Sequence, residues 1–308
     1  MKSPAFAILP KACGRRSTPT PIGNPQPPIP NYPITKLPNY QSLIPPMPAQ
    51  PLVSIVTPSF NQADFLEETI QSVLGQTYPR VEYIIVDGGS SDGSVEIVKK
   101  YEGRIASWVS EPDKGQTDAI NKGFAKAKGD ILAWINSDDS YAAPHAVAEA
   151  VNFLVENPDA AMVYADCNFI DEEGNVIGKF AARQTDYKKL RRGYVHIPQQ
   201  TMFFRAEYWR KAGPLDPSFY FAMDYDLWVR IAKIAPIKYL PGKTWANFRI
   251  HASSKTNVND ARGWKEMLRV HYRDGGSFFA PIVAKYYLRK IIGPLWKWRI
   301  RQRVESRD

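Results

Sequence analysis

Four short clusters of acidic, amide and small residues stand out in the first half of the sequence, because each one follows an apolar run. The clusters are residues 57–61, 87–93, 111–115 and 136–139. Any one of them could be ordinary turn chemistry. Four in succession are better explained by a polar ligand site, in which carboxylates, amides and backbone groups act on one ligand.

The segments that must position these clusters alternate between β-rich apolar runs and helical patterns. The predicted strands are 53–57, 81–87, 105–110, 131–135 and 161–165, and the predicted helices between them are 65–74, 95–101, 117–127 and 146–155. This rhythm predicts an α/β fold with a mostly parallel sheet and helices on both faces. Ligands bind outside the carboxyl ends of strands in such sheets, so we expect the clusters to share one edge.

The rhythm breaks after about residue 166. The sequence predicts a hairpin turn at 171–175, helices near 187–192, 207–211 and 226–235, and a last strand at 237–240. We interpret residues 167–260 as a second lobe of the same domain, which begins near residue 51.

The net charge of +9 is concentrated at the two ends of the chain. Residues 1–50 hold five Lys or Arg and no acid, and residues 262–308 hold twelve Lys or Arg and four acids, which leaves −4 for residues 51–261. A nucleic-acid reader usually carries its basic surface on the folded domain, so no nucleic-acid partner is expected. Basic ends suit an anionic membrane surface or another polyanion better.

The first 50 residues differ in composition from the rest. They contain 13 of the 26 prolines and no periodic pattern, so they are predicted to form a disordered or polyproline-like leader. The two cysteines, Cys13 and Cys167, give no disulfide framework and favour a reducing, cytoplasmic location. The apolar run at 5–9 is too short for a signal peptide, and no membrane-spanning helix is predicted.

Residues 52–256 resemble the inverting glycosyltransferases of family 2, which have the GT-A fold. The segments that carry the resemblance are VSIVTPSFNQADFLEETIQSVLGQTYPRVEYIIVDGGSSDGS, SEPDKGQTDAINKGFAKAKGDILAWINSDD, PQQTMFFRAEYW and DYDLWVRIA. The resemblance implies a Rossmann-like sheet, a nucleotide-diphosphate sugar donor, a divalent metal and inversion at the anomeric carbon. It makes 51–166 the donor half of the domain and 167–260 the acceptor half.

The cluster at 136–139 matches the acidic metal-binding motif of that family. A divalent cation can neutralise the negative charge that develops on a departing diphosphate. Mg²⁺ and Mn²⁺ accept carboxylate oxygens, and Mg²⁺ retains waters, so one or two Asp suffice. The resemblance implies Asp139 as the direct ligand, Asp138 as a donor-binding residue and His251 as a further metal ligand. A purely structural role for His251 stays equally open.

The resemblance also assigns residues to the nucleoside and the phosphates of the donor. Asp87 would accept a hydrogen bond from a pyrimidine ring, because a carboxylate suits an imide N–H, and this favours UDP or dTDP sugars. The other donor-binding residues that it implies are Thr57, Pro58, Asn61, Lys114 and Asp118. Lys114 could equally be a solvated turn residue.

The run that begins at Met223 matches the base motif of the family, which is usually Glu-Asp followed by a helix. An inverting transfer is a single displacement, in which a base removes the proton of the acceptor hydroxyl. The resemblance makes Asp224 that base. Asp226, Gln199 and Gln200 would contact the acceptor, a saccharide or a lipid-linked hydroxyl, although an acid such as Asp226 is also favoured at a helix N-terminus.

Residues 278–303 combine six aromatic side chains with seven Lys or Arg and no acid. Aromatic and cationic side chains together suit a lipid interface. Residues 261–308 are therefore predicted to form a basic, aromatic helical tail, which could attach the protein peripherally to an anionic membrane surface at the inner face of the plasma membrane. A tail that docks on the domain itself is an equal alternative.

Two other functions remain open from the sequence. A nucleotidyltransferase also uses an α/β sheet and a metal, but the basic, Gly-rich first loop expected for it is absent after residues 53–57. A non-enzymatic nucleotide-sugar binding module on the same fold is favoured only by Met223. The sequence therefore favours an enzyme, a hexosyltransferase in cell-surface polysaccharide assembly.

Overall fold

The structure of the chain is a computed structural model. It describes residues 48, 50–251, 254–255, 260–288 and 290. The predicted leader at 1–50 lies outside the described residues except for Pro48 and Gln50, and so does the tail beyond residue 290.

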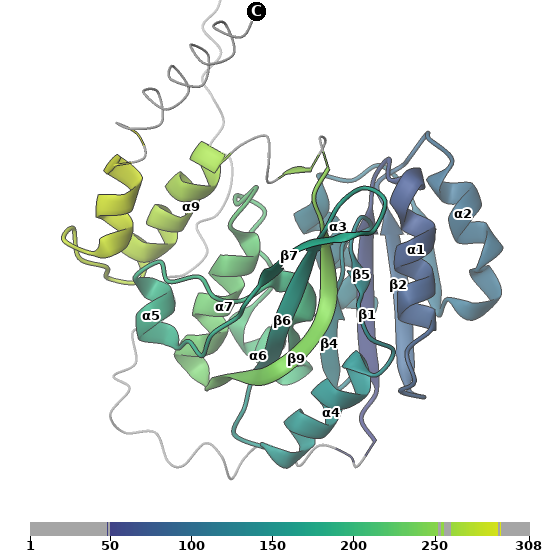
Figure 1. The fold of residues 1–308 in the computed structure, drawn as a ribbon, viewed down its shortest axis with the longest axis horizontal. Helices are drawn as coiled ribbons and strands as arrows, with labels where there is room; N and C mark the ends of the chain where they lie inside the picture. The colour runs from purple at the N-terminus through teal and green to yellow at the C-terminus, as the bar shows by residue number, and fades with distance from the viewer. Residues whose placement is uncertain (1–47, 49, 252–253, 256–259, 289, 291–308) are drawn as a thin grey trace, which may run out of the picture. The chain divides into compact units, whose positions relative to one another are not determined.

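A mixed nine-stranded sheet crosses the described part of the chain, in the order β3-β2-β1-β4-β8-β6-β9-β5 with β7 paired to β6 (Figure 1). Its strands are β1 Val53–Ser59, β2 Val81–Asp87, β3 Ser107–Ser110, β4 Ile131–Trp134, β5 Ser140–Tyr141, β6 Met162–Ile170, β7 Val176–Phe180, β8 Phe203–Arg205 and β9 Ile237–Arg249. Strand β1 pairs in parallel with β2 and β4, and β2 pairs in parallel with β3. The predicted α/β fold is confirmed, and the four strand ends share one edge.

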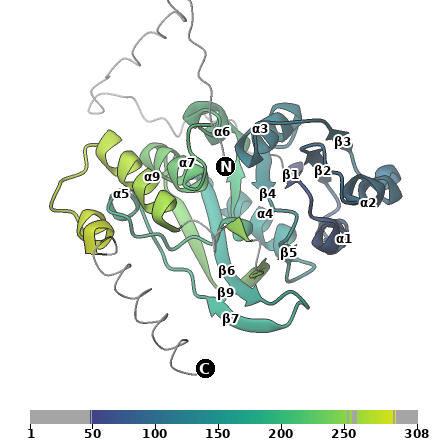
Figure 2. The same cartoon turned by 90° about the horizontal axis from the view of Figure 1, so that it is seen from above.

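Helices cover both faces of the sheet (Figures 1 and 2). They are α1 Ala63–Leu74, α2 Ser94–Lys100, α3 Gln116–Lys126, α4 Ala146–Glu156, α5 Tyr187–Arg191, α6 Ala206–Ala212, α7 Met223–Ile234 and α9 Asp260–Arg273. Successive residues of β1 face opposite layers, since Ile55 lies in the core cluster of α1 and α4 whereas Val56 meets α3. A Cβ on Gly123 of α3 would lie 2.4 Å from Val56 Cγ1, so α3 packs directly on β1.

Apolar side chains from both halves of the chain form the core. One face joins buried residues of α1, α4, β1 and β6 in a single cluster. On the other face, Phe124 of α3 packs edge-on against Trp134 and Phe204, with ring centroids 5.9 and 5.7 Å away. The predicted donor and acceptor halves therefore share one sheet and one core.

Strand β9 is longer than the sequence predicts, because it continues past Leu240 to Arg249. The Pro241-Gly242 pair has the composition of a turn. Gly242 does take a φ of +75°, yet the parallel ladder with β6 resumes after a register shift. This continuation brings the end of β9 to the edge where the predicted site residues gather.

Helix α7 begins at Met223, ahead of the predicted start near residue 226. Glu266 of α9 accepts hydrogen bonds from the N–H groups of residues 220–222, at distances between 2.7 and 3.1 Å. A helix cannot satisfy the N–H groups at its own start. Glu266, which accepts these N–H groups, is more than 40 residues away in the sequence, so the local sequence does not predict this contact.

The described C-terminal part is a helical pair that packs on α7. Helix α9 is followed by a loop and a helical stretch at 281–288. Arg273 of α9 forms an ion pair with Asp226 of α7. The small core of the pair consists of Leu268, Ala280, Ile282 and Val283.

Candidate active site

A cavity of about 1020 Å³ opens at the carboxyl edge of β1, β2 and β4 and reaches the first turn of α7 and one side of α9. Five of the predicted site residues line it: Pro58, Asp138, Gln199, Gln200 and Asp224. The cavity therefore brings together groups from both halves of the chain.

Asp138 lines this cavity and contacts the buried His251, which does not line it. His251 Nε2 lies 3.1 Å from Asp138 Oδ2, and the Asp138 side chain remains 20% exposed. Asp138 follows β4 and His251 follows β9, so the sheet sets their contact. Among the described residues, no group of three or more His, Cys, Asp or Glu could hold a metal on its own. The Asp138 carboxylate suits Mg²⁺ or Mn²⁺ if water and substrate oxygens complete the coordination, and the neighbouring imidazole favours a transition metal such as Mn²⁺ over Mg²⁺.

Asp139 lies behind this pair and is 1% exposed. Its Oδ1 accepts the Arg249 N–H at 3.1 Å, and its Oδ2 accepts the amides of Asn136 and Gln200 at 3.0 and 2.9 Å. Burial, and then the nearby charge of Asp138, raise the pKa of Asp139 well above its usual range. The structure places Asp139 behind the cavity wall, where it ties β9 to the β4 loop, whereas Asp138 faces the cavity.

Arg249 fixes the backbone of that loop. Its Nε donates to the Asp138 carbonyl at 3.1 Å, and its guanidinium lies 4.9 Å from the centre of the Phe65 ring. The same ring packs against the His251 ring at 4.9 Å. Arg249 is 1% exposed and forms an ion pair with Glu68, which balances its buried charge. We therefore describe Arg249 as a positioning residue.

Asp87 is 1% exposed and is held by hydrogen bonds from neighbouring backbone and serine groups. Its oxygens accept the N–H groups of Gly89 and Ser90 and the hydroxyls of Ser90 and Ser110, at 2.5 to 3.1 Å. It does not line the cavity. These bonds let Asp87 shape the turn after β2, and its expected contact with a pyrimidine stays a prediction.

Four other predicted donor-binding residues also lie off the cavity wall. Thr57 is buried and hydrogen-bonds within the sheet at 3.0 Å. Asn61 takes a φ of +51°, and its side chain accepts an N–H from the loop after β2. Asp118 accepts the Lys114 N–H at the start of α3, and the Lys114 side chain is exposed. In the structure these residues set the geometry of the loops.

An aromatic ring and a carboxylate meet over a glycine near the ends of β1 and β2. A Cβ on Gly88 would lie 2.9 Å from Asp113 Oδ2 and 3.2 Å from Phe60 Cδ2, so the absence of a side chain leaves room for both groups. All three residues line the cavity, and Phe60 is 60% exposed. A free ring face and a carboxylate are complementary to a nucleobase, which offers a π face and N–H donors. The sequence analysis missed Phe60 and Asp113, although both lie in its clusters.

Asp224 and Lys255 also line the cavity and influence each other's charge. Burial raises the pKa of Asp224 to about 6, opposed by the Tyr225 N–H and by the charge of Lys255. Burial lowers the pKa of Lys255 to about 8, opposed by Asp224. Lys255 lies 4.0 Å from the Tyr220 ring centre and donates to Gln116 at 3.0 Å. Near neutral pH the cavity therefore holds a carboxylate and a cation.

A chain of amides connects Lys255 to the loop after β4. Gln116 donates to Asn136 at 2.7 Å, Asn136 donates to Gln199 at 3.2 Å, and Gln199 donates to the Trp134 carbonyl at 2.8 Å. Amides in series fix one another's orientation. Gln116 and Lys255 were assigned no role from the sequence, because their contact depends on where α3 and the segment after β9 meet.

Asp226 is fully buried and does not line the cavity. Arg230 donates to one of its oxygens at 2.9 Å, and Arg273 pairs with the other. Asp226 therefore joins α7 to α9, and its expected contact with the acceptor stays a prediction. Met223, which replaces the usual Glu, does line the cavity and accepts the Thr117 hydroxyl at 2.8 Å.

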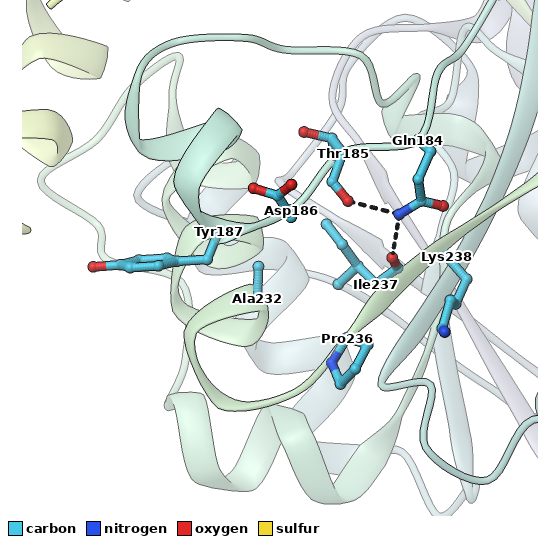
Figure 3. A pocket seen from close by; sticks show the side chains of 8 residues that line it. All are labelled: Gln184, Thr185, Asp186, Tyr187, Ala232, Pro236, Ile237 and Lys238. Carbon is cyan, nitrogen blue, oxygen red and sulfur yellow. Dashed lines mark hydrogen bonds between the residues drawn. The ribbon is translucent and has the colours of Figure 1, made fainter. Parts of the chain in front are cut away.

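A second cavity, of about 370 Å³, lies between α5 and the start of β9 (Figure 3). Gln184 spans its wall by donating to the carbonyls of Thr185 and Ile237, at 2.7 and 2.8 Å. The acidic residue that lines this cavity, Asp186, accepts the Lys189 N–H and thereby caps α5. None of the predicted site residues lines this cavity, so it is not the site that the sequence predicts.

In the part of the chain that the structure describes, no helix is both long and apolar enough to cross a membrane. Cys167 is a buried free thiol, and burial raises its pKa. Cys13 lies outside the described residues.

The amino-acid sequence of this chain is similar to those of known glycosyltransferases. The family profile described as Glycosyl transferase family 2 matches residues 54–221. An uncharacterized glycosyltransferase of Mycobacterium tuberculosis is 35% identical over 190 residues, which cover 61% of this chain and 71% of that protein. The putative teichuronic acid biosynthesis glycosyltransferase TuaG of Bacillus subtilis is 34% identical over 134 residues, which cover 42% of this chain and 52% of TuaG.

Solved structures of glycosyltransferases with the GT-A architecture share the fold. S. aureus TarS 1–349 in complex with UDP-GlcNAc matches with a TM-score of 0.59 and 16% identity, over 79% of this chain and 73% of that one. The mannosyltransferase PcManGT from Pyrobaculum calidifontis, in complex with GDP-Man and Mn²⁺, matches with a TM-score of 0.58 and 22% identity, over 80% of this chain and 72% of that one. The match spans 43% of a longer TarS structure. Because the family profile covers more than half of the chain and the fold agrees with it, the chain belongs to glycosyltransferase family 2 and is a nucleotide-sugar-dependent enzyme.

Proposed function

We propose that the enzyme transfers a sugar from a UDP- or dTDP-sugar to a hydroxyl of a saccharide or lipid-linked acceptor, with inversion at the anomeric carbon. The observation that carries the proposal is that Asp138 and Asp224 line one cavity, at the edge where nucleotides bind in α/β sheets. One carboxylate is beside an imidazole, which suits a metal, and the other has a raised pKa, which suits a base.

The nucleobase of the donor lies against Phe60 and Asp113 in this proposal. The exposed Phe60 ring can stack on the base, and Asp113 can accept its N–H. Pro58 lines the same part of the cavity. The S. aureus relative was solved with UDP-GlcNAc and the P. calidifontis relative with GDP-Man, so both a pyrimidine and a purine belong in a test.

Asp138 and His251 are the residues that would hold Mg²⁺ or Mn²⁺. Their contact and the exposure of Asp138 to the cavity support this role, and the mannosyltransferase of P. calidifontis was solved with Mn²⁺. A bound divalent cation neutralises the charge that develops on the departing diphosphate. Asp139 and Arg249 hold the loop that positions Asp138, through the Arg249 N–H to Asp139 and the Arg249 guanidinium to the Asp138 carbonyl.

Asp224 is the general base. Its carboxylate takes the proton of the acceptor hydroxyl while that oxygen bonds to the anomeric carbon, and the bond from that carbon to the diphosphate oxygen breaks. The nucleoside diphosphate leaves with the bonding electron pair. A pKa of about 6 keeps Asp224 largely ionised at neutral pH and still able to hold a proton.

Lys255 supplies positive charge to the diphosphate. Among the described residues that line the cavity, it is the one Lys or Arg, against the carboxylates of Asp113, Asp138 and Asp224. Its hydrogen bond to Gln116 aims it at the start of α3, where helix N–H groups also favour an anion. A diphosphate would thus meet a cation and a helix N-terminus.

The acceptor side of the cavity has amides and aromatic rings. Gln199, Gln200, Tyr220 and Phe221 line it, and such groups suit the hydroxyls and apolar faces of a sugar ring. The likeness to the putative teichuronic acid enzyme of B. subtilis supports an acceptor in cell-envelope polysaccharide assembly. An acceptor of that kind is consistent with the expected cytoplasmic location.

Titration calorimetry with a panel of UDP-, dTDP- and GDP-sugars, with and without Mn²⁺ or Mg²⁺, tests the donor assignment. We expect metal-dependent binding of a pyrimidine donor, weakened about tenfold or more in Asp113→Ala by the loss of a charge-assisted hydrogen bond. Metal-independent binding, or equal binding by Asp113→Ala, would contradict the assignment. Lys126→Ala is a matched control, because its exposed side chain is also on the donor half and does not line the cavity.

A further inference from the structure

Large apolar side chains gather on the outside of the C-terminal helical pair. Phe278 and Phe279, in the loop after α9, are 62% and 93% exposed, and Tyr287 and Leu288 are 47% and 57% exposed. The Phe278 ring lies 5.9 Å from Phe279 and 6.5 Å from Tyr287, centre to centre. We call these four residues the aromatic tip. A monomeric protein rarely exposes such a group without a use for it.

Cations lie beside the tip on two separate stretches of chain. Lys285 belongs to the helical stretch 281–288, and its Nζ lies 5.3 Å from the ring centre of Tyr194, which follows α5. Helix α5 lies beside the helical pair in both views (Figures 1 and 2); the exposed Lys188 belongs to α5 and the exposed Arg192 directly follows it. We call Lys188, Arg192 and Lys285 the basic rim.

The sequence after Asp274 is strongly basic, and the described rim also has one exposed acid, Asp186, at the start of α5. Residues 275–304 hold seven Lys or Arg and no acid. The acid that precedes them, Asp274, is 6% exposed at its side chain and pairs with Arg273 and Lys233. Residues 291–308 lie outside the described structure, but their sequence adds two Trp and further cations. An aromatic surface bordered by cations is complementary to a lipid interface that carries negative headgroups.

We propose that the aromatic tip and the basic rim dock the enzyme on the surface of an anionic lipid bilayer. Helix α9, which leads into the tip, also lines the catalytic cavity with Gly263 and Met267. Docking therefore holds the acceptor side of the cavity close to the lipid surface, where the hydroxyl of a lipid-linked acceptor would lie. The docking itself does not depend on the proposed sugar transfer, because it is measured without a sugar nucleotide.

Co-sedimentation of the full chain with vesicles tests the docking. We expect the parent to sediment with vesicles of phosphatidylcholine and phosphatidylglycerol, more weakly with pure phosphatidylcholine, and more weakly still at high salt. Phe278→Ser with Phe279→Ser should lower the partition constant about tenfold or more, because two aromatic side chains no longer enter the interface. Lys188→Gln with Arg192→Gln and Lys285→Gln should weaken binding to anionic vesicles and leave binding to neutral vesicles unchanged.

A matched control is Val176→Ser with Ile177→Ser, which removes two exposed apolar side chains (62% and 57%) from the β6–β7 hairpin. This control should bind vesicles as the parent does, and all variants should keep the donor affinity of the parent. Equal sedimentation of the Phe278→Ser, Phe279→Ser variant and the parent would overturn the proposal. So would self-association of the parent through the tip, seen by light scattering, without vesicle binding, since a second copy would then be the occupant.

Discussion

At the scale of single residues, the two adjacent aspartates after β4, Asp138 and Asp139, have different environments. Asp138 is partly exposed to the cavity and touches His251, whereas Asp139 is buried and accepts three hydrogen bonds. Although Asp138 and Asp139 are adjacent in sequence, the turn after β4 points their side chains in different directions. The metal-binding and structural roles can therefore be separated by mutation.

Asp138→Asn should weaken Mn²⁺ binding about tenfold or more, because a neutral amide replaces a carboxylate ligand. Asp139→Asn should keep the metal affinity within about threefold and lower the melting temperature, because an amide oxygen cannot accept all three bonds that this buried carboxyl accepts. Calorimetry with Mn²⁺ and thermal unfolding of both variants measure the two effects. A greater loss of metal affinity in Asp139→Asn than in Asp138→Asn would contradict the assignment.

The pH dependence of kcat/KM should be bell-shaped. Activity should fall below pH about 6, because Asp224 takes up a proton, and above pH about 8, because Lys255 loses its charge. Lys255→Arg should keep the acid limb and lose the alkaline limb, since arginine stays charged. An alkaline limb that persists near pH 8 in Lys255→Arg would assign that limb to another group.

The sequence located the edge of the site better than its individual contacts. Strand ends are predictable from apolar runs, and the cavity indeed lies at the ends of β1, β2 and β4. Asp87 and Asp226 have the residue type that binding requires, yet hydrogen bonds and ion pairs made with distant residues keep both buried. Lys255 was assigned no role from the sequence, because its neighbours Gln116 and Tyr220 come from other elements.

At the scale of elements, α3 and β1 of the donor half pack so closely at Gly123 that no side chain fits between them. A Cβ on Gly123 would lie 2.4 Å from Val56 Cγ1, well inside normal contact. Because β1 carries the first loop of the cavity and α3 begins at Gln116, this contact holds two walls of the site together.

Gly123→Ala should destabilise the protein by about 1–3 kcal/mol, because an overpacked core must shift its side chains or backbone. Gly103→Ala is the matched control, since nothing lies within 4 Å of its Cβ position, and a change within about 0.5 kcal/mol is expected. Urea unfolding of both variants measures the difference. An equal effect of the two substitutions would mean that α3 does not pack on β1 as closely as described.

Strands and helices were predicted best where no turn residue interrupted the apolar pattern of the sequence. The span 81–87 was predicted as it stands in the structure, whereas the last strand was ended too early at Leu240. Pro241 and Gly242 are turn residues by type, but the parallel ladder to β6 resumes after them and carries the strand on to Arg249. Local composition does not predict pairing between strands that are far apart in the sequence, such as β6 and β9.

At the scale of the whole molecule, α9 holds the start of α7 and hence Asp224, the proposed base. Glu266 accepts three N–H groups at residues 220–222, and its hydrogen bonds to them outweigh burial and lower its pKa. Since Asp224 follows two residues later, the position of the base depends on a helix from the C-terminal part. The catalytic and C-terminal parts are therefore coupled.

Glu266→Gln should lower both kcat and stability at neutral pH. The folded pKa of Glu266 lies below the ordinary 4.5, so its contribution is present above that value and is lost as the pH falls through the folded pKa. The stability difference between Glu266→Gln and the parent should thus shrink in acid. Lys265→Ala, at an exposed position of the same helix, is the control. A difference that is constant between neutral and acid pH would contradict the role given to Glu266.

The central claim is that Asp224 acts as the base of a sugar transfer from a nucleotide donor. The most direct test compares Asp224→Asn with the parent, in donor binding by calorimetry and in slow donor hydrolysis with Mn²⁺. We predict that Asp224→Asn binds the donor within about threefold of the parent and loses hydrolysis by about 10²-fold or more, since general-base catalysis contributes about that much. Hydrolysis at the parent rate, with donor binding intact, would contradict the assignment of Asp224.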